Sequence, residues 1–212
     1  MARPRLLWGL LIAVAAGVIV SAGWSRLHAS VPAVVSPLNA DPTPALSIYG
    51  HVPDFALIDE AGRPFDAAGL RGQVWIADFI FTSCAGQCPQ MTDQMRLLQQ
   101  RLPKAVQFVS ITVDPVRDTP TVLTRYSQTH GADPTRWHFL TGELAAIARL
   151  SKEGFRLSFA EGGSPDEPIT HSVRFVLLDQ GGQIRGFYDA TDPEALKRLV
   201  GDAESLLRDL SR

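Results

Sequence analysis

Cysteine is scarce in this chain, since only two of its 212 residues are cysteines. An iron–sulfur cluster needs about four thiolates or their equivalent, and a structural zinc site about four closed ligand positions. Two thiols therefore make both kinds of site poor candidates. The sequence also has no internal repeat, no long run of like charge and no low-complexity tract. One ordinary globular domain with short additions is the simplest organisation that remains.

Positive charge is not in excess beyond the N-terminus. The chain has 20 Lys and Arg against 22 Asp and Glu, and its first thirty residues hold three of the arginines and no acidic residue. The remainder therefore carries 17 basic and 22 acidic residues, a net charge of −5. Nucleic acid is accordingly an unsuitable partner.

Long apolar runs are absent except at the N-terminus, where Leu6–Trp24 contains no charged residue. A helix of about 20 such residues spans a bilayer. Arg3 and Arg5 precede it, so the positive-inside rule keeps residues 1–5 in the cytoplasm and exports everything after the helix. We expect a single-pass inner (plasma) membrane protein with a periplasmic or extracytoplasmic domain. A signal peptide cleaved near Ser21-Ala22-Gly23 is the alternative.

The exported part divides at a proline-rich segment. Residues 25–46 read as a linker, because the stretch VPAVVSPLNADPTPAL contains four prolines and no apolar period. Residues 47–212 then form the folded domain.

Strand and helix signals alternate along this domain. Two continuous apolar runs, Val74–Phe81 and Val106–Val113, indicate buried strands. The remaining signals are a hairpin around Glu60-Ala61-Gly62, helices starting at Pro89 and Pro120 (the second running to Gly131), a strand Trp137–Leu140, a helix Glu143–Ser151, a loop Ala160–Pro168, strands Val173–Leu178 and Gln183–Tyr188 around Gly181-Gly182, and a closing helix opened by Thr191-Asp192-Pro193. This order predicts an α/β, thioredoxin-like fold, with a central mixed sheet and helices on both faces.

Both cysteines, Cys84 and Cys88, follow the first buried strand within FTSCAGQCPQM. Pro89 is best tolerated in the first turn of a helix, so Cys88 should lie near the N-cap, where the helix dipole favours thiolates. A structural disulfide would close a very short loop and stabilise the fold only weakly. A redox couple and a soft-metal site stay open. Two thiolates and one imidazole would suit Cu(I).

Five histidines could supply the imidazole. His28 lies beside the membrane segment, His51 precedes the first hairpin, His130 adjoins a helix stop and His138 lies within a strand. His171 differs, because it closes a loop just before a core strand that should lie against the start of the cysteine helix. From the residues alone, a ligand role and a hydrogen-bonded loop role for His171 are equally acceptable.

Three ordered motifs resemble the Sco/SenC family of membrane-anchored copper chaperones: FTSCAGQCPQM, VDPVRDTP and THSVRFVLLD. The resemblance covers the domain from about Phe55 to the last helix. It implies a thioredoxin-like fold that binds copper, as Cu(I) and with Cu(II) left open, through Cys84, Cys88 and His171. It also implies assembly of the binuclear copper centre of cytochrome c oxidase. Many members have proline directly after the first cysteine, whereas this chain has Ala85.

The family resemblance leaves two leading hypotheses. In the first, the protein is a copper metallochaperone whose partners are the copper-bearing oxidase subunit and other copper chaperones or thiol reductants. In the second, it is an anchored thiol–disulfide reductase whose redox-active pair is Cys84 and Cys88. A peroxidase of the same fold is a weaker third, because it gains nothing from two cysteines in one loop.

Neighbouring residues have simpler explanations than metal binding. Met91 and Met95 have the helical spacing of a core stripe. Asp114, Arg117 and Asp118 are expected to organise the second loop through a salt bridge and turn hydrogen bonds, with support of the metal site as a weaker alternative.

Overall fold

The computed structural model describes residues 46–84, 86–157, 159–164 and 167–209, and it describes the backbone alone for Gln87 and within 159–171. None of the helices in these residues is long and apolar enough to cross a membrane. The segment Leu6–Trp24 and nearly all of the expected linker lie outside the described residues, so the anchor and the linker stay predictions.

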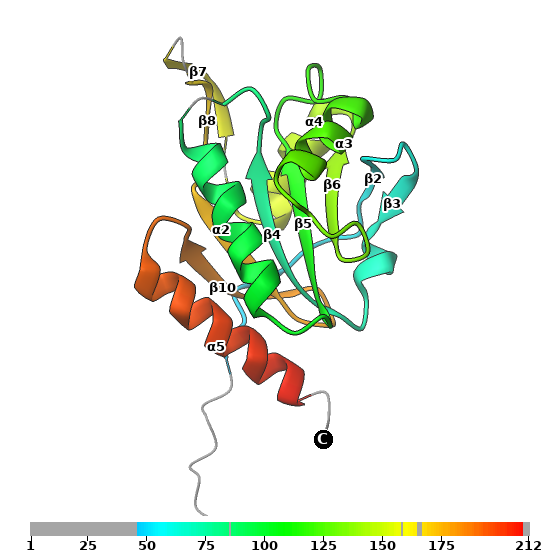
Figure 1. Ribbon diagram of the computed structural model, residues 1–212. Coiled ribbons are helices and arrows are strands. Elements are labelled where there is room, and N and C mark those ends of the chain that lie inside the picture. The colour runs from blue at the N-terminus through cyan, green and yellow to red at the C-terminus, as the bar shows by residue number, and fades with distance from the viewer. Residues whose placement is uncertain (1–45, 85, 158, 165–166, 210–212) are drawn as a thin grey trace, which may run out of the picture. The chain divides into compact units, whose positions relative to one another are not determined.

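A mixed eight-stranded sheet forms the centre of the domain, in the order β1-β10-β9-β4-β5-β6-β2-β3 (Figure 1). Its strands are β1 (Gly50–His51), β2 (Ala56–Asp59), β3 (Pro64–Asp66), β4 (Val74–Ile80), β5 (Val106–Thr112), β6 (Trp137–Thr141), β9 (Arg174–Leu178) and β10 (Gln183–Asp189). Strands β4, β5 and β6 are parallel, and the other pairings are antiparallel. The carboxyl ends of β4, β5 and β6 therefore share one edge of the sheet.

Helices cover both faces of this sheet. They are a 3-10 turn η1 (Ala67–Leu70), α2 (Gln87–Arg101), α3 (Pro120–Thr129), α4 (Leu144–Arg149), a π-helical turn η2 (Leu150–Gly154) and α5 (Pro193–Asp209). Helices α2, α3 and α5 contribute buried side chains to one core, and α4 with η2 contributes to the other. The predicted mixed sheet with helices on both faces is confirmed.

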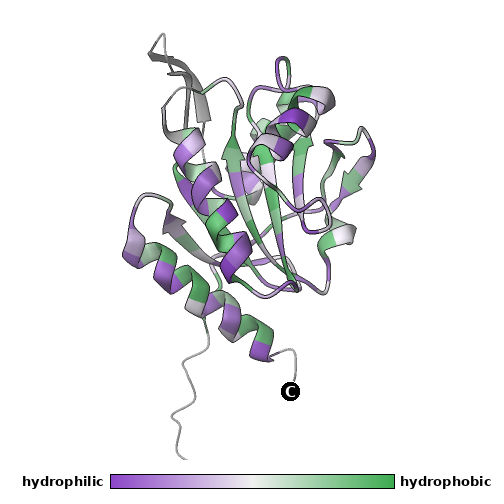
Figure 2. Cartoon of the chain, viewed as in Figure 1, coloured by the Kyte–Doolittle hydropathy of each residue, from purple (hydrophilic) through white to green (hydrophobic). Residues whose placement is uncertain are grey.

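Strand β4 separates the two cores, because all seven of its residues are buried. On one face, Ile76 and Ile80 pack in the same cluster as the apolar stripes of α2 and α5. On the other, Trp75 and Phe79 make edge-to-face contacts with Phe155, at ring distances of 5.9 and 5.2 Å. Figure 2 shows the result: strands that are mainly hydrophobic lie between helices with one polar side.

The prediction of a loop at Ala160–Pro168 is wrong. Strands β7 (Phe159–Ser164) and β8 (Glu167–His171) form a separate antiparallel hairpin, in which Phe159 pairs with His171. The pairing shifts register between Glu161 and Ser164, where two glycines occur. Pro168 is accommodated because a two-stranded hairpin has only edge strands. The hairpin projects from the domain beside the N-terminal end of α2 (Figure 1).

Smaller differences concern the ends of helices. Helix α2 begins at Gln87, two residues before Pro89, and α3 ends at Thr129 with His130 as its C-cap. The expected turns at Gly62 and Gly182 are confirmed, since both glycines have positive φ values, 77° and 75°.

Candidate functional site

Both cysteines lie where the chain leaves the carboxyl end of β4 and enters α2. The backbone N–H of Cys84 donates to the carbonyl of Phe81 at 3.3 Å, which closes a turn directly after the strand. Gly86 is the N-cap of α2, and Cys88 is the second residue of the helix. Pro89 is the third, a first-turn position where its missing N–H breaks no helical hydrogen bond.

The two thiols are buried, unbridged and adjacent. Cys84 is 7% exposed, Cys88 is 0% exposed, and no disulfide joins them. Their side chains are hydrogen-bonded to each other, and the backbone of Phe81 also bonds to the Cys88 sulfur. The two sulfurs therefore lie together at the start of α2.

Burial affects the protonation of the Cys88 thiol more strongly than its position at the helix N-terminus does. Desolvation raises the pKa of this thiol far above its ordinary value, the Phe81 backbone offsets part of the rise, and Cys84 and the nearby Asp78 add to it. The expectation that helix position favours a thiolate is therefore wrong for Cys88. The free protein holds a proton there at neutral pH.

Asp78 is a polar residue that the sequence analysis overlooked. It lies in β4, is fully buried, and neither carboxyl oxygen makes a hydrogen bond of ordinary geometry with any described residue. Burial raises its pKa to about 7, and Ser110, its paired residue on β5, offsets only part of the rise. The visible signal was an acidic residue within the otherwise apolar run VWIADFIF.

A second loop, residues 113–119, supports the cysteine loop from β5. The buried carboxylate of Asp118 accepts hydrogen bonds from the Thr82 backbone N–H, the Thr82 hydroxyl and the Thr112 hydroxyl. Arg117 and Asp114 form a salt bridge of 3.0 Å within the loop. The expected salt bridge and turn hydrogen bonds are confirmed, and Asp118 additionally ties this loop to the residues just before Cys84.

The backbone of His171 lies at the same end of the sheet as the cysteines. Strand β9 is antiparallel to β4, with Val176 opposite Ala77, so β9 starts beside the carboxyl end of β4. His171 is the last residue of β8, shortly before β9 begins. Its side chain lies outside what the structure describes, and its role as a ligand stays a prediction.

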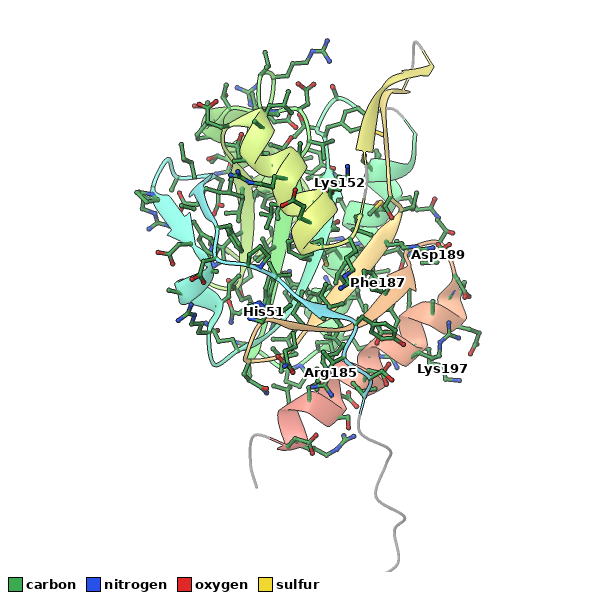
Figure 3. The ribbon with its side chains drawn as sticks, turned by 180° about the vertical axis from the view of Figure 1, so that it is seen from behind. His51, Lys152, Arg185, Phe187, Asp189 and Lys197 are labelled. Carbon is green, nitrogen blue, oxygen red and sulfur yellow. The ribbon has the colours of Figure 1, made fainter. Side chains whose placement is uncertain are left out.

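Three other histidines have different surroundings. The His130 ring lies 4.4 Å from that of Tyr126 and its Nδ1 is 3.6 Å from an Asp93 oxygen. The His138 ring lies 5.0 Å from that of Phe65. His51 belongs to edge strand β1 and lies well away from the β7–β8 hairpin (Figure 3). Among the side chains that the structure describes, no group of three or more His, Cys, Asp or Glu is arranged to hold a metal.

Met91 and Met95 are core residues. Both are 0% exposed and belong to the cluster between α2 and the sheet. Thr92, which lies between them in the sequence, shares a partly buried hydrogen bond of 2.8 Å with the Tyr126 hydroxyl. The prediction that Met91 and Met95 pack in the core is confirmed.

The SCO1/SenC family model matches residues 47–206, nearly the whole described domain. The chain belongs to the SCO1/SenC family. This result confirms the resemblance that rested on three motifs.

Individual relatives agree in sequence and in fold. The chain is 29% identical over 158 residues to the SCO1 protein homolog of Bacillus subtilis, covering 73% of this chain and 81% of the relative. A solved structure of BsSco, described as a member of the Sco family of cytochrome c oxidase assembly proteins and as having a disulfide switch, matches with a TM-score of 0.68 at 27% identity, covering 76% and 96% of the two chains. Yeast Sco1 with copper bound matches with a TM-score of 0.60 at 27% identity, covering 74% and 90%.

Proposed function

We propose that this SCO1/SenC protein binds copper and delivers it during assembly of the binuclear copper centre of cytochrome c oxidase. Cys84, Cys88 and His171 would be the ligands. The proposal is supported by membership of a family whose relatives include an oxidase assembly protein and a copper-bound Sco1.

One observation carries the proposal: two buried, unbridged thiols are hydrogen-bonded to each other at the start of α2. Two adjacent, buried sulfurs suit a soft, low-coordinate ion such as Cu(I). The backbone position of His171 at the same end of the sheet makes it the natural source of a third ligand.

Protonation should couple to copper binding. Cys88 holds its proton at neutral pH because burial raises its pKa, and a thiol must lose its proton to bind copper. Copper binding therefore releases protons, and apparent affinity should increase as pH rises.

The proposed setting is the outer face of the inner membrane, with the domain tethered through Leu6–Trp24. Its partners would be the copper-bearing subunit of the oxidase and the proteins that supply copper or reduce the thiols.

The second candidate is a thiol–disulfide reductase that keeps the oxidase's copper-ligand cysteines reduced. The observation in its favour is that Cys84 and Cys88 are both buried, unbridged and in side-chain contact with each other. In such a step, the two thiols would form a disulfide while the partner's disulfide gained two electrons and two protons.

Substitution of His171 separates the two candidates. His171→Ala in the full-length chain, purified in detergent, should lower Cu(I) affinity at least about 10- to 100-fold, because loss of a ligand should cost more than loss of its supporting contacts. Competition with a chromogenic Cu(I) chelator measures the affinity. His51→Ala, an exposed histidine outside the site, is the matched control and should leave affinity unchanged.

The thiol chemistry of the His171→Ala variant supplies the second measurement. The copper proposal expects its cycling between dithiol and disulfide to persist while oxidase assembly in cells is impaired. If the variant binds copper and supports the oxidase like the wild type, while Cys88→Ser does not, the reductase replaces the chaperone as the better account.

A further inference from the structure

Val116 is the most exposed large apolar side chain in the described part of the protein, at 81%. It lies in the loop of residues 113–119, between β5 and α3. Because β4 and β5 are parallel neighbours, this loop and the cysteine loop occupy the same edge of the sheet. The exposed side chain of Val116 therefore lies at the end of the sheet that carries the cysteine pair.

The exposure of Val116 is built into the loop. The backbone N–H groups of Arg117 and Asp118 both donate to the Asp114 carbonyl, at 3.2 and 2.9 Å, and the Thr119 N–H donates to the Arg117 carbonyl at 3.0 Å. The Arg117–Asp114 salt bridge closes the same turn. Pro115 directly precedes Val116 and restricts the backbone further. These bonds hold the side chain outward.

The same loop is fixed relative to the thiols. The Val113 N–H donates to the Ile80 carbonyl at 2.8 Å, and Asp118 accepts two hydrogen bonds from Thr82. Thr82 lies two residues before Cys84. Val116 and the cysteine pair therefore form one preorganised unit.

The chain segment that carries the cysteines is uncharged. Residues 79–92 contain no acidic or basic residue, and those exposed among them include Ser83, Gly86, Pro89 and Gln90. Beside this segment, Val116 projects from the neighbouring loop, and the exposed Arg117 that follows it is paired with Asp114. An uncharged segment next to one fixed apolar side chain is typical of a protein interface, where charged residues are depleted at the centre and a few anchors dominate binding.

We propose that Val116 is a recognition residue that inserts into an apolar depression on the folded protein domain which exchanges copper with Cys84 and Cys88. This inference rests on the proposed function. The exchange is a ligand substitution: bonds from Cu(I) to Cys84, Cys88 and His171 break as bonds to the partner's ligands, two thiolates among them, form. Protons from the partner's thiols return to the two cysteines, and no electron is transferred. Such a contact is small and short-lived, as in other transient encounters.

Val116→Asp tests this role, with the soluble copper-bearing domain of a cytochrome c oxidase subunit, thiols reduced, as the probe. Stopped-flow measurement of Cu(I) transfer from the full-length chain should show a rate about 10- to 100-fold lower than wild type, as expected when an interface anchor is lost. Val116→Leu, which keeps an apolar projection, should retain most of the rate.

Two controls separate recognition from damage to the site. Cu(I) affinity and the thiol reaction with a small aromatic disulfide should be unchanged in Val116→Asp, because neither involves a protein surface. Ile48→Asp changes an apolar residue of 59% exposure outside the site and should transfer copper at the wild-type rate.

The remaining outcomes are equally decisive. A wild-type rate in Val116→Asp, or an equal loss in Ile48→Asp, overturns the recognition role while the proposed function stands. Absence of transfer from the wild type overturns both. A wild-type dimer that dissociates in Val116→Asp, detected by sedimentation, would assign the residue to contact between copies and also overturn the role.

Discussion

Asp78→Asn should stabilise the copper-free, reduced protein at neutral and alkaline pH. Asp78 is fully buried without a hydrogen bond of ordinary geometry in the described structure, and burial raises its pKa from 3.8 to about 7. The folded state therefore keeps a proton that the unfolded chain has already released. The stability that protonated Asp78 contributes to the folded state is fully present below pH 3.8 and is lost progressively as the pH rises through 7.

The size of this loss follows from the two pKa values. A difference of about three units corresponds to roughly 4 kcal/mol at pH 8, and about 2.5 kcal/mol of it accumulates between pH 5 and pH 8. Asparagine has nearly the same shape and does not ionise, so the variant lacks this dependence. For a chain of this size, 2.5 kcal/mol corresponds to roughly 5–10 °C in melting temperature.

Urea unfolding at pH 5, 6, 7 and 8 measures the effect. The free energy of unfolding of Asp78→Asn relative to wild type should increase by about 2.5 kcal/mol across that range. Asp54→Asn, which removes an exposed ion pair with Arg71, should change stability at pH 8 by less than about 0.5 kcal/mol. An Asp78→Asn advantage that is constant with pH would refute the assignment of a protonated, buried Asp78.

Two further substitutions test the packing of the fold. In Gly186→Ala the added Cβ would clash with the ring and hydroxyl of Tyr188, which donates a hydrogen bond to Asp202 of α5. This variant should destabilise the protein by about 2 kcal/mol in urea unfolding. Gly201→Ala, whose added Cβ has no atom within 4 Å, should be neutral or slightly stabilising. Asp118→Ala leaves three hydrogen-bond donors unpaired and should destabilise the protein by about 3 kcal/mol. The loosened cysteine loop should also let Cys84 be alkylated faster, which mass spectrometry measures. An unchanged rate of alkylation would show that Asp118 does not hold the cysteine loop.

Sequence patterns predicted the parts of the fold that depend on local periodicity. The apolar runs Val74–Phe81 and Val106–Val113 correspond to β4 and β5, and Pro89 located the first turn of α2. The glycines of the two tight turns predicted the hairpins because positive φ favours glycine.

Features that depend on tertiary contacts could not be predicted in this way. The β7–β8 hairpin contains the glycines and proline typical of loops, yet its two strands pair along their length, with Phe159 opposite His171. The raised pKa of Cys88 results from complete burial, which spacing does not reveal. Asp78 could not be recognised for the same reason, because its burial without a hydrogen bond of ordinary geometry to any described residue depends on the strands and helices that surround it.

X-ray absorption at the copper edge of the copper-loaded, full-length protein tests the central claim most directly. The proposed site predicts two sulfur ligands and one imidazole nitrogen, with the imidazole signal lost in His171→Ala and one sulfur lost in Cys84→Ser or Cys88→Ser. A copper environment without sulfur, or one that His171→Ala leaves unchanged, would contradict the three-ligand site.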